Sequence, residues 1–169
     1  MKKFYLYIIL LLPIVLLLSS CTYKKSTSSN QSNNSNAEQI KTTKFSEPKE
    51  IIYYNNGQKT VINKEDEKFN GMVSATEKMI EGIKDQYGST FPIGDLKNKG
   101  KLLEYDYSEK QVLEYTTSKG TKRTITYTKL YFDVNKGDSI SNLMAFEGEG
   151  YGPVGPLGSN DELLKLLNK

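Results

Sequence analysis

The chain has 169 residues, with 23 Lys and Arg against 20 Asp and Glu, one cysteine and no histidine. Two of the basic residues, Lys2 and Lys3, lie at the extreme N-terminus, so the rest is nearly neutral and lacks the concentrated basic patch of nucleic-acid-binding proteins. The absence of histidine excludes Ser-His and Cys-His nucleophiles and the commonest zinc ligand. We therefore expect no nucleic-acid partner, no metal and no cofactor, and we favour a non-enzymatic role.

Residues 1–20 have the organisation of an export signal. Lys2 and Lys3 precede the apolar run 4–18, and the small residues Ser19 and Ser20 follow it. A helix of this length would rise about 22 Å at 1.5 Å per residue, which is short of the roughly 30 Å hydrocarbon core of a bilayer. The segment therefore favours a cleaved signal peptide over a transmembrane anchor.

The end of this leader carries a recognisable motif, which consists of Leu18, Ser19, Ser20 and Cys21. It resembles the lipobox of bacterial lipoproteins, in which a leucine and two small residues precede the lipid-attached cysteine. The resemblance implies cleavage by signal peptidase II, a diacylglycerol on Cys21 and additional acylation such as palmitate. It places the chain at the cell membrane on its extracytoplasmic face, and the frequent Asn, Lys and Ile are typical of a Gram-positive source.

Residues 21–45 are rich in Ser and Asn and can bury little apolar surface, so we expect a disordered tether. From residue 46 onward the pattern changes to that of a folding unit. About 125 residues are enough for one hydrophobic core. We therefore expect a single domain over 46–169.

The domain begins with a predicted hairpin. Two β-prone runs, 50–54 and 58–62, flank Asn-Gly, which is the strongest short-range signal for a two-residue turn. Apolar residues at spacings of three and four then predict a helix that is capped by Asn63, has acidic residues 65–67 in its first turn and ends at Gly88. We expect a loop over 89–100.

Four further strands are predicted at 101–107, 111–117, 122–134 and 139–147. Three-residue connections at 108–110 and 119–121 would pair Tyr105 with Leu113 and Tyr115 with Ile125. Both registers direct the same side chains toward the core: Leu103, Tyr105, Tyr107, Leu113, Tyr115, Ile125 and Tyr127. The opposite face, with Glu104, Asp106, Glu114 and a series of threonines, is predicted to be solvated.

Beyond Lys129 the apolar phase shifts to Leu130, Phe132 and Val134, which predicts a β-bulge. Ser159 or Asn160 then caps a short C-terminal helix rich in leucine. The complete prediction is an α+β fold, with a β-hairpin, an amphipathic helix, a four-stranded antiparallel meander and a short C-terminal helix.

Two features are candidates for function. The carboxylates Glu104, Asp106 and Glu114 could act on a glycosidic bond, although ordinary solvated positions, softened by Lys101, Lys122 or Arg123, are the favoured interpretation. The Gly- and Pro-rich stretch 148–158 is either a rigid loop that displays Tyr151 and Val154 to a partner or a connection to the last helix. The favoured hypothesis is a binding module that contacts an envelope protein or cell-wall glycan. The alternatives are a glycan-acting enzyme and a structural accessory of an envelope complex.

Overall fold

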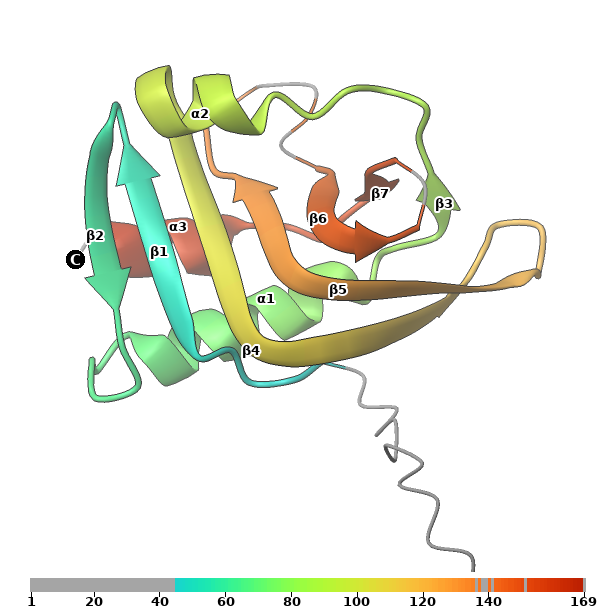
Figure 1. Ribbon diagram of the computed structural model, residues 1–169, viewed down its shortest axis with the longest axis horizontal. Coiled ribbons are helices and arrows are strands. Elements are labelled where there is room, and N and C mark those ends of the chain that lie inside the picture. Colours follow the sequence, from blue (N-terminus) through green and yellow to red (C-terminus); the bar gives the residue numbers. More distant parts are fainter. Residues whose placement is uncertain (1–44, 136, 138–139, 141, 151, 169) are drawn as a thin grey trace, which may run out of the picture. The chain divides into compact units, whose positions relative to one another are not determined.

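The computed structural model describes residues 45–135, 137, 140, 142–150 and 152–168, all of which belong to one compact unit. The described residues form one antiparallel sheet with strand order β2-β1-β4-β5-β6-β7-β3, together with three helices (Figure 1). The α+β class is therefore confirmed. The predicted hairpin and meander are not separate parts, because β1 pairs with β4 and joins them into one sheet.

The N-terminal hairpin consists of β1, Glu50–Asn55, and β2, Gln58–Ile62. Asn55 faces Gln58, so the turn contains only Asn56 and Gly57, with positive φ angles of 50° and 85°. Asparagine and glycine tolerate this left-handed conformation best. The predicted hairpin is confirmed.

Two of the predicted strands are one strand. β4, Lys101–Thr116, runs through residues 108–110 with an irregularity rather than a turn, and pairs along its length with β5, Lys122–Asp133. Both predicted registers are wrong, since Tyr105 faces Leu130 and Leu113 faces Ile125. For the connection at 119–121, the observed register differs from the predicted one by two residues. A shift of two residues leaves every side chain on its predicted face of the sheet. The predicted core-facing set is therefore buried as expected.

The irregularity predicted beyond Lys129 lies just before that residue, because the register between β5 and β6, Met144–Glu149, shifts between Tyr127 and Lys129. Two short strands were not predicted: β3, Asp85–Gln86, and β7, Val154–Gly155, which pair with each other, while β7 also pairs with β6. The tip of the β4–β5 hairpin reaches β3, where Ser118 Oγ donates to Asp85 Oδ1 at 2.9 Å.

One face of the sheet is covered by α1, Phe69–Ile80, and α3, Asp161–Leu167 (Figure 1). α1 starts and ends within the predicted span: Asn63 is not its cap, residues 65–67 precede it, and Tyr87 is exposed. Asp66 accepts the Lys68 N–H at 2.9 Å in the preceding turn. At α3 the N-cap position is Asn160, one of the two predicted residues, but its side chain makes no capping hydrogen bond. The Ser159 Oγ accepts the Asp161 N–H at 3.2 Å in the turn before the helix.

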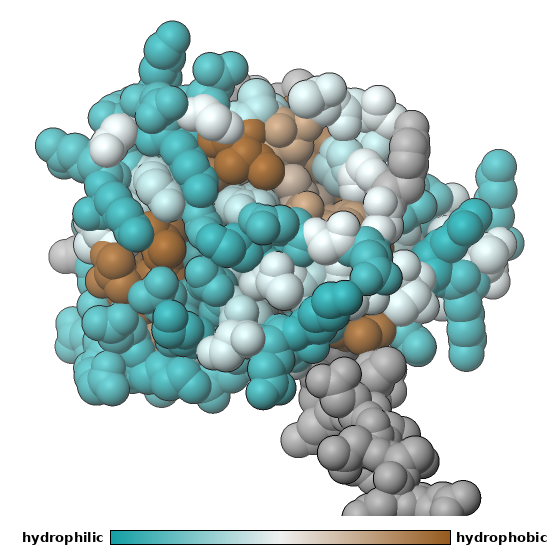
Figure 2. All heavy atoms as spheres, in the orientation of Figure 1, coloured by the Kyte–Doolittle hydropathy of each residue, from teal (hydrophilic) through white to brown (hydrophobic). Residues whose placement is uncertain are grey.

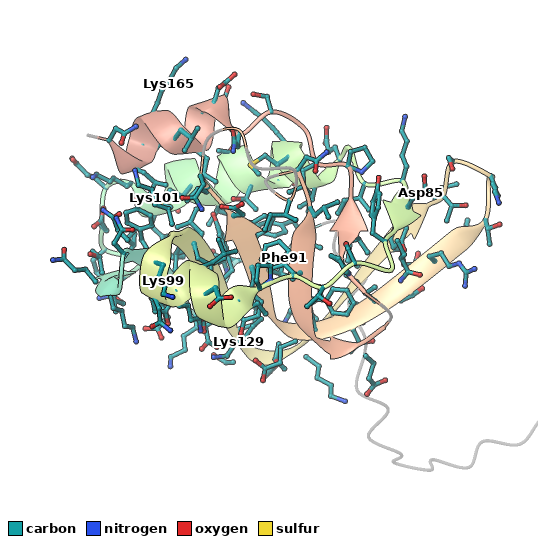
Figure 3. All side chains as sticks on the ribbon, turned by 90° about the horizontal axis from the view of Figure 1, so that it is seen from above. Asp85, Phe91, Lys99, Lys101, Lys129 and Lys165 are labelled. Carbon is teal, nitrogen blue, oxygen red and sulfur yellow. The ribbon has the colours of Figure 1, made fainter. Side chains whose placement is uncertain are left out.

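The opposite face carries a helix where a loop was expected. This helix, α2, Ile93–Lys99, covers a second apolar cluster formed by Leu96, Leu102, Tyr131 and Ala145. Figure 3 shows α2 on one side of the sheet and the helices α1 and α3 on the other side. The face predicted to be solvated is therefore partly buried, and both faces of the sheet contribute to a core.

Candidate functional site

The most concentrated charge in the described part of the chain lies between α2 and the sheet. Glu104 on β4 is only 2% exposed, and both of its carboxylate oxygens are paired. Lys97 of α2 lies 2.6 Å from Oε2, and Lys129 of β5 lies 2.8 Å from Oε1. Tyr54 of β1 also donates its hydroxyl to Oε2 at 3.2 Å. Three strands and a helix therefore meet at one buried carboxylate, which we call the Glu104 cluster.

Local structure explains how the lysines reach this carboxylate. Lys129 stands directly opposite Asp106 on the neighbouring strand, and its Nζ lies 3.4 Å from Asp106 Oδ2. Glu104 is two residues before Asp106 on β4, so both carboxylates lie on the same face of the sheet as Lys129. Lys97 lies in the last turn of α2, and its ammonium sits 4.8 Å from the ring centroid of Tyr54 and 5.3 Å from that of Tyr131. Ring faces attract cations, so the aromatic pair holds Lys97 over the carboxylate.

The electrostatics of the cluster favour the charged form of the Glu104 carboxylate. Burial is the largest single influence and raises the pKa of Glu104, but hydrogen bonds from Lys129 and Lys97 and the Coulombic attraction of the same two lysines together lower the pKa overall. The hydrogen bond to Glu104 is likewise the main reason why the pKa of Lys129 is raised. Each partner therefore stabilises the charged form of the other.

This arrangement does not suit glycoside hydrolysis. The general acid of a glycosidase must hold a proton near neutral pH, which requires a raised carboxyl pKa. Glu104 has the opposite shift, and Asp106 shares the same lysine. Glu114 is not brought into the cluster, because it lies beyond the β4 irregularity, opposite Thr124, and is exposed. Of the three predicted carboxylates, Glu104 and Asp106 therefore lie together with lysines, and Glu114 is a separate surface residue.

The lysines that neutralise the carboxylates are not those predicted. Lys101, Lys122 and Arg123 were expected nearby, whereas Lys97 and Lys129 do this. Lys129 could have been found from the sequence, because a correct β4–β5 register places it opposite Asp106. Lys97 could not, because the helix that carries it was predicted to be a loop.

The Gly- and Pro-rich stretch is mostly part of the fold. Val154 is fully buried in β7, so the prediction that its side chain is displayed is wrong, and Tyr151 lies outside the described residues. The Tyr87 N–H donates to the Pro153 carbonyl at 2.8 Å, and the Gly158 N–H donates to that of Met79 at 2.7 Å. These bonds support the alternative interpretation, a connection that leads to the last helix.

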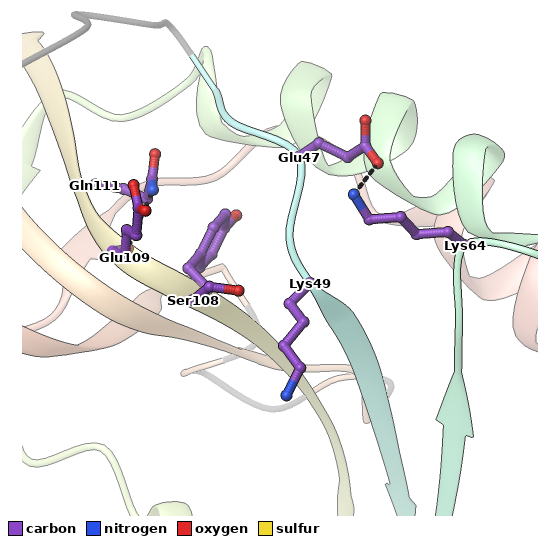
Figure 4. A pocket seen from close by; sticks show the side chains of 7 residues that line it. Glu47, Lys49, Lys64, Ser108, Glu109 and Gln111 are labelled. Atoms are coloured by element: carbon purple, nitrogen blue, oxygen red, sulfur yellow. Dashed lines mark hydrogen bonds and ion pairs between the residues drawn. The ribbon is translucent and has the colours of Figure 1, made fainter.

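A shallow hollow of about 220 Å³ lies at the irregularity of β4. Figure 4 shows its labelled side chains: Glu47 is ion-paired with Lys64 at 2.6 Å, Lys49 points away from that pair, and Ser108, Glu109 and Gln111 line the strand side. Polar groups that are dispersed and solvated in this way do not converge on a common point. The hollow therefore lacks the convergent polar groups that characterise small-molecule sites.

Within the described residues, no group of three potential metal-ligating side chains comes together, and no helix is long and apolar enough to cross a membrane. The lipobox residues Leu18, Ser19, Ser20 and Cys21 lie outside the described part. Comparison with known proteins gave no match to a family model, a curated protein or a solved structure. The class of the chain is therefore given by its own fold, an α+β domain with an antiparallel sheet covered on both faces.

Proposed function

We propose that this chain is a bacterial lipoprotein whose domain acts as a binding module on the extracytoplasmic face of the cell membrane. The leader 1–20, the lipobox match and the solitary Cys21 support the anchor. Two acyl groups in addition to a thioether-linked glycerol would give stable attachment, whereas one chain holds marginally. In this proposal residues 22–44 tether the domain to the lipid.

The first described residues suit this attachment. Phe45 packs edge-on against Tyr105, with ring centroids 6.2 Å apart, and the Lys49 N–H donates to the Asp106 carbonyl at 2.7 Å. The chain therefore enters the domain at a point that is held by both the core and the sheet. A pull on the tether would act on these contacts before it reached β1.

Metabolic labelling with palmitate tests the anchor. We expect label on the wild-type chain and none on Cys21→Ala, which should accumulate as an uncleaved precursor. Absence of label on the wild type, or label that persists on Cys21→Ala, would contradict the proposed lipid anchor.

The observation that favours binding over catalysis is the Glu104 cluster, whose only buried carboxylate is neutralised by two lysines. The same face of the sheet offers apolar surface beside it: Phe91, Ile93 and Ile140 are half-buried around α2. Figure 2 shows hydrophobic side chains that reach the surface beside α2 within a hydrophilic surrounding. An apolar centre with a polar rim is the usual anatomy of a protein interface. We therefore propose an envelope protein as the partner of this face.

Photocrosslinking on intact cells tests the binding face. We expect a photoreactive side chain at position 91 to capture a partner, and Ile93→Asp in the same chain to abolish its recovery. Aspartate in the first turn of α2 is compatible with the helix. Ser74→Asp on the opposite helix α1 is the matched control and should leave recovery unchanged. Equal recovery from both variants would refute the assigned face. Loss of the chain itself when the partner gene is deleted would identify a structural accessory.

The glycan-acting alternative has its own experiment. Turnover of peptidoglycan by the purified chain that disappeared with Glu104→Gln, while the variant remained folded, would overturn the preference for binding. We expect no turnover by either protein, because Glu104 lacks the raised pKa of a general acid.

A further inference from the structure

β2 is the outermost strand at one end of the sheet, and its outer edge has no strand partner among the described residues (Figure 1). The closing pair of a two-residue hairpin exchanges hydrogen bonds, and bonded pairs then alternate along the ladder. Asn55 faces Gln58 at the turn, and Tyr53 faces Thr60 two residues further along. Thr60 is therefore in a bonded pair, and its backbone N–H and C=O groups point toward β1. Lys59 and Val61 therefore direct their backbone N–H and C=O groups away from β1, toward the open edge.

The side chains of this edge are also accessible. Val61 is 41% exposed, one of the two exposed large hydrophobic residues in the described part of the chain, and Lys59 and Thr60 are exposed beside it. Lys59 forms no ion pair with any described residue. An unpaired edge with accessible groups is a template for a further strand.

The two ends of β2 carry opposite charge. At its N-terminal end the turn is bonded to the end of α2, since the Asn56 N–H donates to the Gly100 carbonyl at 2.8 Å. This places the exposed Lys99 beside the end of the hairpin that carries Lys59, and neither lysine is ion-paired to a described residue. At the C-terminal end Lys64 is ion-paired with Glu47 at 2.6 Å, and the exposed Glu65 and Glu67 that follow it supply the negative charge. The strand is about 16 Å long at roughly 3.3 Å per residue, and the Debye length is about 8 Å at physiological salt. The charges at the two ends are therefore screened from each other, and each end presents its own charge to a partner.

We propose that two copies of this chain pair through antiparallel β2 edges, with the two-fold axis at Thr60. In this register Lys59 of one copy faces Val61 of the other, so all four outward N–H groups bond a carbonyl and no two lysines stand opposite each other. The basic end of each strand meets the acidic end of the other. A parallel arrangement would bring like charges together. The edge is thus complementary to itself in hydrogen bonds, apolar contact and charge.

The pairing involves a five-residue strand, so the interface is small and association depends on concentration. A single edge lysine usually discourages pairing. Here that lysine faces an apolar residue of the second copy, and its stem can cover Val61 while the ammonium remains in water. This inference does not rest on the proposed lipid anchor, and it is tested in solution.

Disulfide trapping tests the register. The chain from residue 21 is used with Cys21→Ser, so that an introduced cysteine is the only thiol. Thr60→Cys places two thiols across the axis, in a non-bonded pair whose Cα atoms are about 4.5 Å apart, within disulfide range. We expect it to crosslink several times faster than Lys59→Cys or Val61→Cys alone, and we expect a mixture of these two to crosslink with each other. Equal rates for the three single variants would overturn the proposal.

Sedimentation of the chain with Cys21→Ser and no further change provides the second measurement. We expect a concentration-dependent shift toward dimer that is lost in Val61→Pro, because this proline removes only an outward N–H and leaves the bond pattern with β1 intact. Circular dichroism should show the same fold. Raising the salt from about 0.05 to about 0.5 M should weaken the dimer. A monomer at every concentration, as expected if the edge instead takes a segment of another protein, would refute self-pairing.

Discussion

The hydroxyl groups of Tyr105 and Thr76 are hydrogen-bonded in the core, and this contact ties β4 to α1. The Tyr105 hydroxyl also lies 3.3 Å from the Met72 carbonyl, one turn earlier on the helix. Tyr105 is fully buried and packs edge-on against Phe132. Most polar groups that are buried at this depth have hydrogen-bond partners, and α1 supplies both partners of the Tyr105 hydroxyl.

Tyr105→Phe should lower the free energy of unfolding by about 1 kcal/mol. The ring remains in place, and the freed Thr76 hydroxyl can donate to the Met72 carbonyl four residues earlier, which limits the loss. Urea denaturation of Tyr105→Phe, Thr76→Val and the double variant measures the coupling. Two single effects that add fully in the double variant would show that the contact contributes nothing.

Glu104→Gln should destabilise the domain by about 2 kcal/mol, since it leaves Lys97 without a counter-charge and Lys129 with only the more distant Asp106. The loss is smaller than for a fully buried pair, because Lys97 and Lys129 are 28% and 30% exposed. Glu114→Gln, at an exposed position on the same strand, is the matched control and should have little effect. Equal effects of the two substitutions on the urea midpoint would contradict the structural role of the cluster.

The Glu104 cluster also predicts a pH dependence. The pKa of Glu104 is lowered in the folded chain, so its stabilisation is present above the ordinary carboxyl pKa of about 4.3 and is lost as pH falls through the lower folded value. The stability difference between wild type and Glu104→Gln should therefore be constant near neutrality and narrow below about pH 4. A difference that grew on acidification would reverse the assigned sign.

The core tyrosines should make the fold sensitive to alkali. Burial raises the pKa of Tyr127 to about 12, and it raises the pKa of Tyr105, Tyr107 and Tyr131 further. Their contribution to stability is complete below the unfolded pKa of about 10 and is lost as pH rises through the folded values. Tyrosinate absorbance should show these groups ionising together with unfolding. The chain in denaturant should titrate near pH 10 throughout.

Two glycines with positive φ should respond differently to alanine. A Cβ at Gly148 would lie 2.0 Å from the carbonyl oxygen of Thr126 on the neighbouring strand, whereas a Cβ at Gly120 meets no atom within 4 Å. We expect Gly120→Ala to cost about 1 kcal/mol for the backbone conformation alone. Gly148→Ala should cost about 3 kcal/mol or more, because the strands must also separate. Similar melting temperatures for the two variants would contradict the close approach.

Local patterns in the sequence were sufficient for several elements. Asn56-Gly57 between two β-prone runs predicts the turn because few other residue pairs adopt its backbone angles. The period-two alternation of Leu103, Tyr105 and Tyr107 identifies the buried face of β4, and it survives a wrong register because a slip of two residues preserves the face. The phase change beyond Lys129 likewise predicts an irregularity in β5, which lies one step earlier, between Tyr127 and Lys129.

Tertiary contacts decided the rest. Nothing in the local sequence distinguishes a bent strand at residues 108–110 from a turn. The strand forms because β4 pairs with β5 on both sides of this segment. The second covered face had a signal, the adjacent apolar pairs Ile51-Ile52, Leu102-Leu103 and Tyr131-Phe132, which are typical of strands buried on both sides. The seven-residue α2 is too short to be stable alone and forms where Leu96 and Lys97 meet the sheet.

For function, the sequence by itself determined the predicted attachment at Cys21, because the lipobox consists of four consecutive residues and needs no contact from elsewhere in the chain. The meaning of Glu104 was decided only by the tertiary structure. In the sequence this residue is one of three alternate-position carboxylates, and its environment depends on Lys97 and Lys129, which approach it from different elements. A charge owes its pKa to neighbours in space, so the same carboxylate changed from a candidate acid into the centre of a structural ion cluster.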